Sequence, residues 1–446
     1  MSIVDLAAAR GAHTPLTRVL ATAHVAAVGD PGARLLAGAG AGAGGESWAS
    51  HEARLGVLEV ADDPALVRAL VRESGLRGRG GAGFLAATKF DVAAQSPGRP
   101  IIVVNASEGE PASRKDRTLL TLRPHLVLDG ALVAAAAAGA RDVVIYSHRA
   151  RVRVDAALRA ALGERAPSPV RVRVVDAPET YVAGETSSVV SYLDGRGAIP
   201  RRGVVPAARA GVAQRPTVVN NVETLAHLAL IARFGASWFR EVGTDESPGS
   251  TLLTLTGAVR ERGTVVEVVG PTTFGDVLAS HGGLTHPPRA VLLGGYEGTW
   301  MSGEDAWRAP VERHRLGRLG VSLGCGVVAV LGDETCGLAQ TARLVRWLVG
   351  QSAGQCGPCI FGLPSVSELL DALAAGRARR GDVRRLRTLV ASVRGRGACG
   401  HPTGVATLVD SALDTFTSEL ESHRRALTGA AQRDLDDFPL PIGALR

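Results

Sequence analysis

Five side chains stand out in this chain because their residue types are otherwise missing from it. Among 446 residues there are only two lysines, Lys89 and Lys115, and three asparagines, Asn105, Asn220 and Asn221. Arginine supplies all the other basic residues, although lysine is normally one of the commonest residues. A lysine ammonium is a compact charge with three donors, and an asparagine amide both donates and accepts on one short arm. Because arginine and aspartate do not replace these groups, we expect the five residues to serve a binding site.

A glycine-rich loop leads to the first lysine. Residues 77–89 read R-G-R-G-G-A-G-F-L-A-A-T-K, and Gly78, Gly80 and Gly83 fit the pattern G-x-G-x-x-G. No strand is expected before this loop, so it is not a Rossmann fingerprint. Glycines still allow backbone N–H groups to approach a flat or phosphorylated ligand closely, and Lys89 adds a mobile positive charge for a phosphate. A tight surface turn is the alternative interpretation.

Carboxylates accompany the first asparagine. Residues 104–117 read V-N-A-S-E-G-E-P-A-S-R-K-D-R and place Glu108 and Glu110 close to Asn105. Carboxylates in such a position accept hydrogen bonds from sugar hydroxyls, as the acidic residue of dinucleotide-binding folds does from a ribose. A solvated polar loop is the alternative.

The paired asparagines lie in a fourth candidate segment, after a third at residues 181–187 (Y-V-A-G-E-T-S). Asn220 and Asn221 belong to P-T-V-V-N-N-V-E-T at residues 216–224, between a β-branched run and the start of a helix. Paired amides there can read the edge of a heterocycle that has both donors and acceptors. Alternatively they cap the helix, and one asparagine could fill each role.

Three of the five cysteines have the spacing of a metal site. Cys356 and Cys359 form C-x-x-C in G-Q-C-G-P-C-I-F-G, and Cys399 follows in R-G-A-C-G-H-P. In a reducing compartment, C-x-x-C with a remote third cysteine favours an iron–sulfur cluster. A zinc site formed by the three cysteines and His401 is the alternative. The other two cysteines are expected to be packing residues.

Composition and charge argue against several other classes. The formal charge is +7, but the arginines are spread along the chain, and no aromatic stacking residues or recognisable module point to nucleic acid. The densest basic run, residues 376–397, is expected to be a solvated helix face, or else a docking surface for an acidic partner. The start of the chain lacks the regions of a signal peptide. The apolar run at 126–140 is short and contains Asp129, which favours a buried helix over a membrane span. We therefore expect a cytoplasmic protein that does not insert directly into a membrane.

Alternating apolar runs predict an α/β domain that positions the four loops. The predicted strands span residues 101–104, 143–146 and 170–175, and the predicted helices span residues 67–74, 119–138 and 154–162. Strands that alternate with helices are typical of a parallel sheet covered by helices. Asn105 should then lie just past the carboxyl end of a strand, where open α/β sheets bind ligands.

Two further units follow this domain. From about residue 245, short strands with a hairpin and one short helix predict a small β-grasp module of α+β type. From about residue 338 the pattern is helical, with predicted helices at 339–349, 366–375, 383–393 and 405–421. The predicted organisation is a flexible segment at 1–60, an α/β domain at 61–244, a β-grasp domain at 245–335, a helical domain at 336–430 and a tail at 431–446.

In combination these motifs resemble the family of NADH-oxidising, 51-kilodalton flavoprotein subunits of respiratory complex I, with its relatives in bidirectional hydrogenases and NAD-linked formate dehydrogenases. The likeness runs from about residue 60 to 425. Its most specific parts are R-G-R-G-G-A-G-F, N-x-x-E-G-E-P with K-D-R, and T-V-x-N-N-V-E-T. The resemblance implies a Rossmann-like parallel-sheet FMN domain, a small β-grasp (ubiquitin-like) domain and a C-terminal helical bundle carrying an iron–sulfur site.

The resemblance also implies roles for single residues. The residues implied to hold FMN are Gly78, Arg79, Gly80, Lys89, Asn105, Ser107, Glu108, Gly184, Glu185, Asn220, Asn221 and Thr224. The residues implied to contact NADH as substrate are Phe84, Glu110 and Glu185. The implied ligands of the iron–sulfur cluster are Cys356, Cys359 and Cys399.

The chain departs from the family pattern on both sides of the flavin. The family's cluster motif, S-C-G-x-C-x-P-C, places its first ligand at Ala353, which leaves three cysteines. The cluster is then [4Fe–4S] with an unusual fourth ligand, for which His401 is a candidate, or [3Fe–4S], or absent. On the nucleotide side, Ser107 and Thr186 replace acidic residues, and the counterpart of the family's P-R-L-K-P-P-F-P lacks its lysine and phenylalanine. Nearly all the family residues that hold FMN are present in this chain, whereas several that contact NADH are replaced.

Three hypotheses follow. The first is an electron-transfer oxidoreductase that takes a hydride from NADH onto FMN and passes single electrons through the cluster to a ferredoxin-like or thioredoxin-fold iron–sulfur protein. The second is an FMN and iron–sulfur relay between protein partners that no longer uses NADH. The third is an assembly protein with a structural zinc at the three cysteines.

Overall fold

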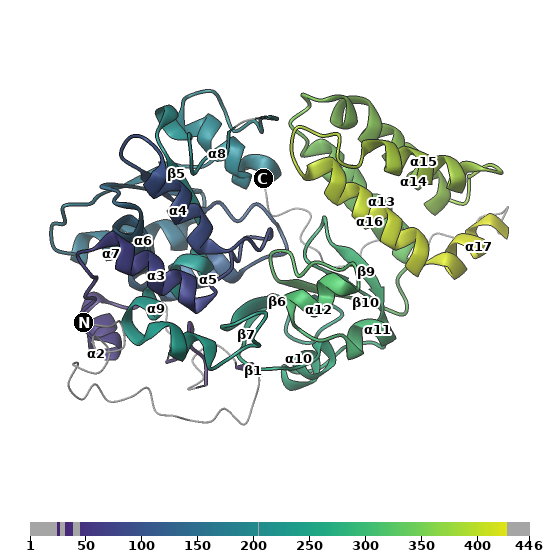
Figure 1. Cartoon of the computed structure of the whole chain (residues 1–446). Coiled ribbons are helices and arrows are strands. Elements are labelled where there is room, and N and C mark those ends of the chain that lie inside the picture. The colour runs from purple at the N-terminus through teal and green to yellow at the C-terminus, as the bar shows by residue number, and fades with distance from the viewer. Residues whose placement is uncertain (1–24, 27–31, 39–44, 204, 426–446) are drawn as a thin grey trace.

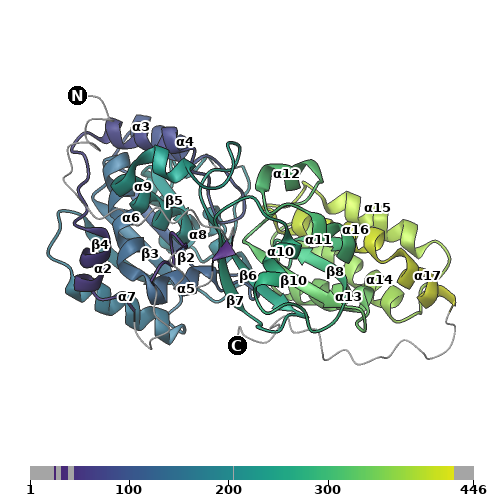
Figure 2. The same cartoon turned by 90° about the horizontal axis from the view of Figure 1, so that it is seen from below.

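The computed structural model describes residues 25–26, 32–38, 45–203 and 205–425. An α/β part, a six-stranded sheet and a helical part follow one another along the chain (Figure 1). The six-stranded sheet lies between the other two parts, as the view from below shows (Figure 2).

Four parallel strands form the sheet of the α/β part, in the order β4-β3-β2-β5. The strands are β2 (Ile101–Ala106), β3 (Asp142–Ser147), β4 (Arg171–Asp176) and β5 (Thr217–Asn221). Side chains alternate along β2, so that Ile102 and Val104 enter one core while Ile101 and Val103 enter another. A strand buried on both faces needs apolar residues at successive positions, which explains the β-branched runs. The predicted parallel sheet is confirmed.

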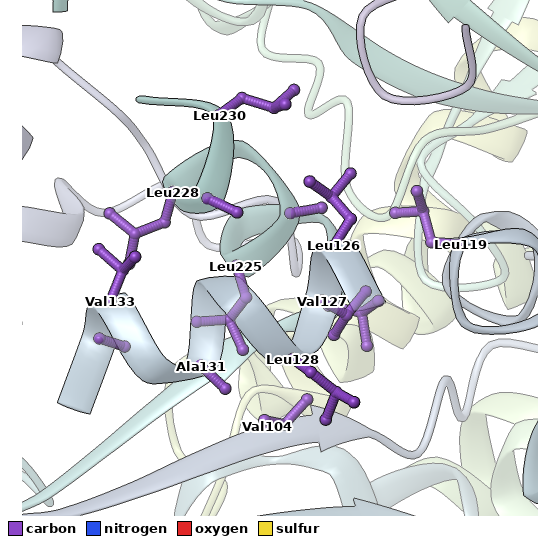
Figure 3. Packing of buried hydrophobic residues seen from close by; sticks show 14 of the residues in the cluster. Val104, Leu119, Leu126, Val127, Leu128, Ala131, Val133, Leu225, Leu228 and Leu230 are labelled. Atoms are coloured by element: carbon purple, nitrogen blue, oxygen red, sulfur yellow. The ribbon is translucent and has the colours of Figure 1, made fainter. Parts of the chain in front are cut away.

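Helices cover both faces of this sheet. The helices of the α/β part are α3 (Pro64–Ser74), α4 (Ala86–Gln95), α5 (Lys115–Leu122), α6 (Pro124–Ala138), α7 (Val152–Glu164), α8 (Thr186–Leu193) and α9 (Val222–Arg240). Helix α6 packs against α9, whose Leu225 and Leu228 lie along it (Figure 3). Gly130 of α6 permits this approach, because a Cβ atom there would lie 1.8 Å from the carbonyl oxygen of Leu225.

The predicted helix at 119–138 is wrong in one respect, because it is two helices. Helices α5 and α6 meet at an angle of 100° on either side of Arg123. Pro124 has no N–H to donate and its ring disfavours a helical residue before it, so the chain turns there. Among the described residues no single helix is long and apolar enough to cross a membrane; α5 and α6 meet that condition only as this bent pair.

The six-stranded sheet has the order β1-β7-β6-β10-β8-β9, with β6 and β10 parallel and the other neighbours antiparallel. Its strands are β1 (Val25–Ala26), β6 (Thr251–Gly257), β7 (Thr264–Val268), β8 (Pro288–Leu293), β9 (Thr299–Ser302) and β10 (Val327–Gly332). One face is covered by α10 (Phe274–Ser280), α11 (Gly303–Arg308) and α12 (Arg313–Arg318). The other face packs on the helical part, where the rings of Trp300 and Phe416 lie 5.2 Å apart.

The predicted helical C-terminal part is confirmed. Its helices are α13 (Gly337–Gly350), α14 (Leu363–Ala374), α15 (Asp382–Val393), α16 (His401–Thr415) and α17 (Thr417–Arg425). The predicted helix at 405–421 is divided at Phe416, whose buried ring packs beneath β9. Helix α15 buries Leu386 and Val390 and exposes its arginines, as a solvated helix face does.

Part of the segment predicted to be flexible, at 1–60, makes buried contacts in the structure. Leu35 and Leu36 have no exposed surface, and their N–H groups donate to the buried carboxylate of Glu267 at 2.9 and 3.2 Å. Helix α2 (Trp48–Leu55) follows. The Gly/Ala-rich composition concealed this contact because its partner lies 231 residues further on. Residues 1–24, 27–31 and 39–44, and the predicted tail at 431–446, lie outside the described residues.

Candidate functional site

A cleft of about 380 Å³ opens where β2 and β5 end. This is the edge at which open parallel sheets bind ligands. Eight of the predicted site residues line it: Gly80, Asn105, Ser107, Glu108, Glu110, Gly184, Glu185 and Asn221. Loops from the six-stranded sheet complete it with Gly294, Glu297, Gly298, Ser322, Gly324 and Cys325. The four segments singled out in the sequence therefore converge on one hollow.

Asn105 holds two of these segments together. It lies inside β2, paired with Tyr146 and Asn221, and not just past the strand as predicted. Its amide nitrogen donates to the carbonyl of Gly184 at 2.8 Å, and its amide oxygen accepts from the Ser107 hydroxyl at 2.7 Å. A donor and an acceptor on one arm are both used, which explains why asparagine is needed here.

Glu108 is saturated by the chain itself. Its carboxylate accepts hydrogen bonds from Ser113 Oγ, Asp116 N and Arg117 Nε, each at 2.9 Å. Burial alone would raise the pKa of Glu108, but Arg117 and Arg151 outweigh burial and lower it. The predicted hydrogen bond from a sugar hydroxyl would have to compete with these donors, so the side chain of Glu108 shapes the loop instead.

Glu110 joins the α/β part to the six-stranded sheet. Its carboxylate accepts from the N–H of Tyr296 at 2.8 Å, the N–H of Ala112 at 3.2 Å and the Tyr181 hydroxyl at 3.3 Å. Burial raises the pKa of Glu110 to about 7, against these hydrogen bonds and with help from the charge of Glu297. Glu110 therefore titrates near neutral pH within the cleft.

The raised pKa of Glu110 predicts a pH-dependent stability. A folded-state pKa above the unfolded value of 4.5 means that the folded protein holds the proton more tightly, so stability falls as the pH rises from about 4.5 to about 7. Glu110→Gln should lack this loss, and its stability relative to the parent should rise by up to about 3 kcal/mol across the window. Urea unfolding at pH 5 and pH 8 measures it, with the exposed Glu304→Gln as control. Identical pH profiles for parent and Glu110→Gln would contradict the assignment.

A buried ion cluster around Lys115 forms the floor of the cleft. Its ammonium lies 2.8 Å from Asp116 Oδ1, 2.9 Å from Glu223 Oε2 and 3.0 Å from Asn221 Oδ1. Burial lowers the pKa of Lys115, but the two carboxylates outweigh it and raise that pKa. Burial also raises the pKa of Asp116 although Lys115 opposes it. We expect one ammonium and two carboxylates to keep Lys115 charged.

Lys115 and Asp116 were missing from the residues that the sequence implied as cofactor contacts, yet both line the cleft. The scarcity of lysine had nevertheless already indicated Lys115 as a binding-site residue. Asn221 fills the capping role considered for it: its side chain accepts from the N–H of Glu223 at 3.0 Å and starts α9. It also donates to Asp116 Oδ2 at 2.6 Å.

The other predicted residues lie outside the lining of the cleft. Lys89 donates to the carbonyl of Val219 at 2.9 Å, and burial lowers its pKa. Asn220 is 3% exposed, and its amide nitrogen has no partner within the described residues.

Thr224 accepts from the N–H of Arg79 at 2.9 Å. The side chain of Arg79 lines a different cavity. Gly78 and Phe84 are also apart from the cleft, and Phe84 is 68% exposed.

These residues fit a flat, polar and phosphorylated cofactor. Asn220 offers a buried amide donor that nothing in the described chain uses, and Lys89 a half-buried ammonium held by one carbonyl. Gly184 and Gly109 allow the chain at the rim of the cleft to pack closely. A Cβ atom at Gly184 would lie under 3.0 Å from Ser107 Oγ, and a Cβ atom at Gly109 would lie under 3.0 Å from the carbonyl oxygen of Tyr181. The donor set therefore suits FMN.

The three predicted cluster cysteines lie together in the helical part. Burial opposes ionisation of Cys356, but backbone hydrogen bonds from Ala398 and Cys359 outweigh burial and lower its pKa. Burial raises the pKa of Cys359 to about 12, and the charges of Cys356 and Cys399 act on it in the same direction. Among the described residues no group of three His, Cys, Asp or Glu side chains is arranged to hold a single metal ion.

The position of the first ligand in the cluster motif has no thiol. Ala353 stands at this position, and the hydroxyl of the preceding Ser352 lowers the pKa of Cys359. His401, the proposed alternative ligand, has both ring nitrogens engaged, Nδ1 at 2.5 Å from Glu297 Oε1 and Nε2 at 3.0 Å from the carbonyl of Leu348. The three cysteines fit a cluster with three thiolate ligands, and His401 is not free to supply the fourth.

Comparisons with known proteins match both parts of the chain. Residues 71–230 match the family described as Nuo51 FMN-binding domain, and residues 333–423 match the NADH-ubiquinone oxidoreductase-F iron-sulfur binding region. Among curated relatives, the second NADH-quinone oxidoreductase F subunit of Rhizobium meliloti is 32% identical over 79% of this chain and 87% of its own length. The NADH-quinone oxidoreductase F subunit of Streptomyces coelicolor is 32% identical over 85% and 88%.

A solved structure is similar in fold as well. A chain of the NAD⁺-reducing [NiFe]-hydrogenase in its H₂-reduced state superposes with a TM-score of 0.74 at 30% identity over 81% of this chain. The match spans 62% of the length of that hydrogenase chain.

Proposed function

This chain belongs to the family of NADH-quinone oxidoreductase F subunits, and from this premise we propose that it takes a hydride from NADH onto FMN and passes single electrons through an iron–sulfur cluster to a protein acceptor. FMN supplies the conversion, because a flavin accepts two electrons at once and releases them singly. We further propose that the acceptor is a ferredoxin-like or thioredoxin-fold iron–sulfur protein.

The observation that carries this proposal is the short connection between the cleft and the cysteines. Tyr181 lines the cleft, and its ring lies 5.6 Å from that of Trp347 and 5.8 Å from that of His401. Glu297 also lines the cleft and contacts His401, which is two residues from Cys399. One electron carrier in the cleft and one at the cysteines would therefore be separated by a single layer of side chains.

In this proposal the chain's own residues bind and orient, and none exchanges protons with the substrate. Lys89, Asn220, Asn221 and the glycine loop hold FMN, while Asn105 ties the loop bearing Gly184 to the strand edge. Cys356, Cys359 and Cys399 bind the cluster, and Glu110 and Glu185 contact NADH. Loops of the six-stranded sheet line one side of the cleft and so limit the access of water to it.

We also infer the domain layout. The β6–β7 hairpin, helix α10 and the central parallel pair of β6 and β10 support a β-grasp domain between the FMN domain and the helical cluster domain. The loop after β8 and the loop before β10 reach the cleft through Gly294 and Gly324, respectively.

An anaerobic spectrum with added NADH tests the function. Flavin bands that NADH bleaches, with residual brown absorbance, would support it. A flavin that only dithionite bleaches would favour the relay between protein partners, to which the exposed Phe84 and the replaced residues Ser107 and Thr186 also point. A colourless protein would contradict both and leave the structural zinc hypothesis.

Lys89→Ala should lower flavin occupancy without changing the spectrum of the flavin that remains. Its ammonium donates to one backbone carbonyl, so its removal should change the stability of the fold little. The bound cofactor, however, would lose an ionic contact. The flavin-to-protein ratio after desalting measures the effect, and we expect it to fall by about tenfold at limiting FMN. Arg159→Ala, an exposed arginine, is the control. Full flavin content in Lys89→Ala would remove Lys89 from the FMN site.

A further inference from the structure

A second cavity lies beside the cleft and shares none of its lining residues. It encloses about 340 Å³ between segments 243–251, 268–276 and 310–315, with Arg79 of the glycine loop as one wall. This volume is within the range of small-molecule sites. Apolar side chains supply much of the lining: Val268, Pro271, Pro310, Val311 and Leu323.

Three arginines and two carboxylates line this cavity, but the carboxylates are engaged elsewhere. Glu312 accepts from Ser247 Oγ at 2.7 Å and from the N–H of His314 at 2.6 Å. Asp276 accepts from the N–H and hydroxyl of Thr273 at 3.1 and 2.7 Å. Glu312 is therefore the N-cap of α12, and Asp276 belongs to the capping box of α10.

Two of the arginines carry buried donors that the described chain does not satisfy. Arg79 is 6% exposed and donates to the carbonyl of Pro248 at 3.0 Å, while its Nε has no partner within the described residues. The buried Nε of Arg313 is in the same situation. Burial lowers the pKa of Arg79 to about 10, and the charge of Arg313 acts in the same direction, whereas the charge of Glu223 opposes both. Glu223 also acts on Arg313 and already pairs with Lys115 at 2.9 Å, so the two guanidiniums share one carboxylate with an ammonium. Buried like charges with unmet donors are costly unless an anion accompanies them.

We propose that this cavity binds a small organic anion, in which a carboxylate or phosphate on an apolar body is held by Arg79 and Arg313. A guanidinium presents paired donors that match the oxygens of either group. The apolar walls accommodate the body of the molecule, so inorganic anions should bind more weakly than anions that carry a ring.

Binding of an anion in the cavity should change the affinity of the neighbouring cleft for its cofactor. Arg313 Nη1 donates to the carbonyl of Gly81 at 2.9 Å, and Gly81 lines the cleft. Arg79 directly precedes Gly80, which also lines the cleft. An anion that draws on Arg313 competes with the Gly81 carbonyl, so anion binding changes the affinity of the cleft for its cofactor, and the cofactor changes anion affinity by the same factor. This coupling rests on the proposed function, whereas the binding itself does not.

The test is calorimetric titration of the FMN-loaded, full-length protein with phenyl phosphate, benzoate and inorganic phosphate. We expect at least one aromatic anion to bind with a dissociation constant about tenfold or more below that of inorganic phosphate. Arg313→Leu and the cavity-filling Thr244→Trp should each weaken binding by about tenfold or more. Arg308→Leu is the matched control, because this exposed arginine of α11 pairs with Glu304 outside the cavity. NADH should not displace the anion.

Three outcomes would overturn the site: no binding of any probe, unchanged affinity in Thr244→Trp, or displacement by NADH, which would move the probe to the nucleotide site. The coupling has its own readout. The dissociation constant of FMN, measured by flavin fluorescence with and without the aromatic anion, should differ by the factor that FMN imposes on the anion. An equal FMN affinity in both conditions would refute the coupling while leaving the site itself standing.

Discussion

Replacing Lys115 with methionine should lower the free energy of unfolding by about 3–5 kcal/mol and deprive the protein of flavin. Lys115 is 1% exposed, and its ammonium contacts Asp116, Glu223 and Asn221. Without it, two buried carboxylates lose the ammonium that pairs with both, and Asn221 loses one of its donors. Because Asn221 caps α9 and lines the cleft, the damage reaches the cofactor site as well as the fold.

Chemical denaturation and the flavin-to-protein ratio measure the two effects of Lys115→Met. Arg72→Met is the control, because Arg72 pairs with Asp91 at the surface with 58% of its side chain exposed, and we expect a change within about 1 kcal/mol. The double variant Lys115→Met with Glu223→Gln should recover part of the lost stability, since it removes one unpaired charge. A Lys115→Met protein as stable as the parent would show that the cluster does not hold the floor of the cleft.

The path of the strands could be predicted from the sequence because it depends on local periodicity. The β-branched runs at 101–104 and 143–146 lie within observed strands, and the run at 170–175 begins one residue before its strand. The runs are visible in the sequence because both faces of that sheet are buried. The ends of the strands could not be predicted as closely. Asn105 is polar and so looked like the end of β2, but its side chain finds partners in Gly184 and Ser107 and the ladder continues through it.

Contacts between distant segments could not be predicted, because composition does not specify a partner. Residues 34–36 lie in the segment predicted to be flexible, yet their backbone supplies three hydrogen-bond donors to the buried carboxylate of Glu267. A carboxylate is buried only when its oxygens accept hydrogen bonds, and here the donors come from a segment far away in the sequence.

The candidate site shows the same limit at the level of single side chains. Residue type and order placed Asn105, Glu110 and Asn221 in one cleft, and the structure brings them together there. The direction of a side chain was not readable: Glu108 turns to Ser113 and Arg117, and Arg79 turns to the second cavity. A glycine pattern in the sequence indicates where the backbone of a loop lies, but it does not indicate which side the arginine within it enters.

Cys399→Ser should abolish the iron–sulfur cluster, and Ala353→Cys should complete it. The three cysteines are the whole thiolate set of this site, so losing one leaves two ligands, too few to retain iron. Ala353 follows Ser352, whose hydroxyl lowers the pKa of Cys359. A thiol at 353 would therefore stand where the family motif has its first ligand, and a fourth thiolate in place of a neutral ligand should lower the reduction potential.

Iron and sulfide content, electron paramagnetic resonance and a redox titration of anaerobically purified protein distinguish the possible clusters. If the parent holds [3Fe–4S], Ala353→Cys should raise its iron content toward that of [4Fe–4S]. If the parent already holds [4Fe–4S] with a neutral fourth ligand, iron content should stay constant while the potential falls. Cys336→Ser is the control for thiol loss, because Cys336 lies at the start of α13, where it contacts Glu419 away from the cluster cysteines. An Ala353→Cys protein unchanged in both iron content and potential would mean that position 353 does not face the metal, and that the fourth ligand must be sought elsewhere in the helical part.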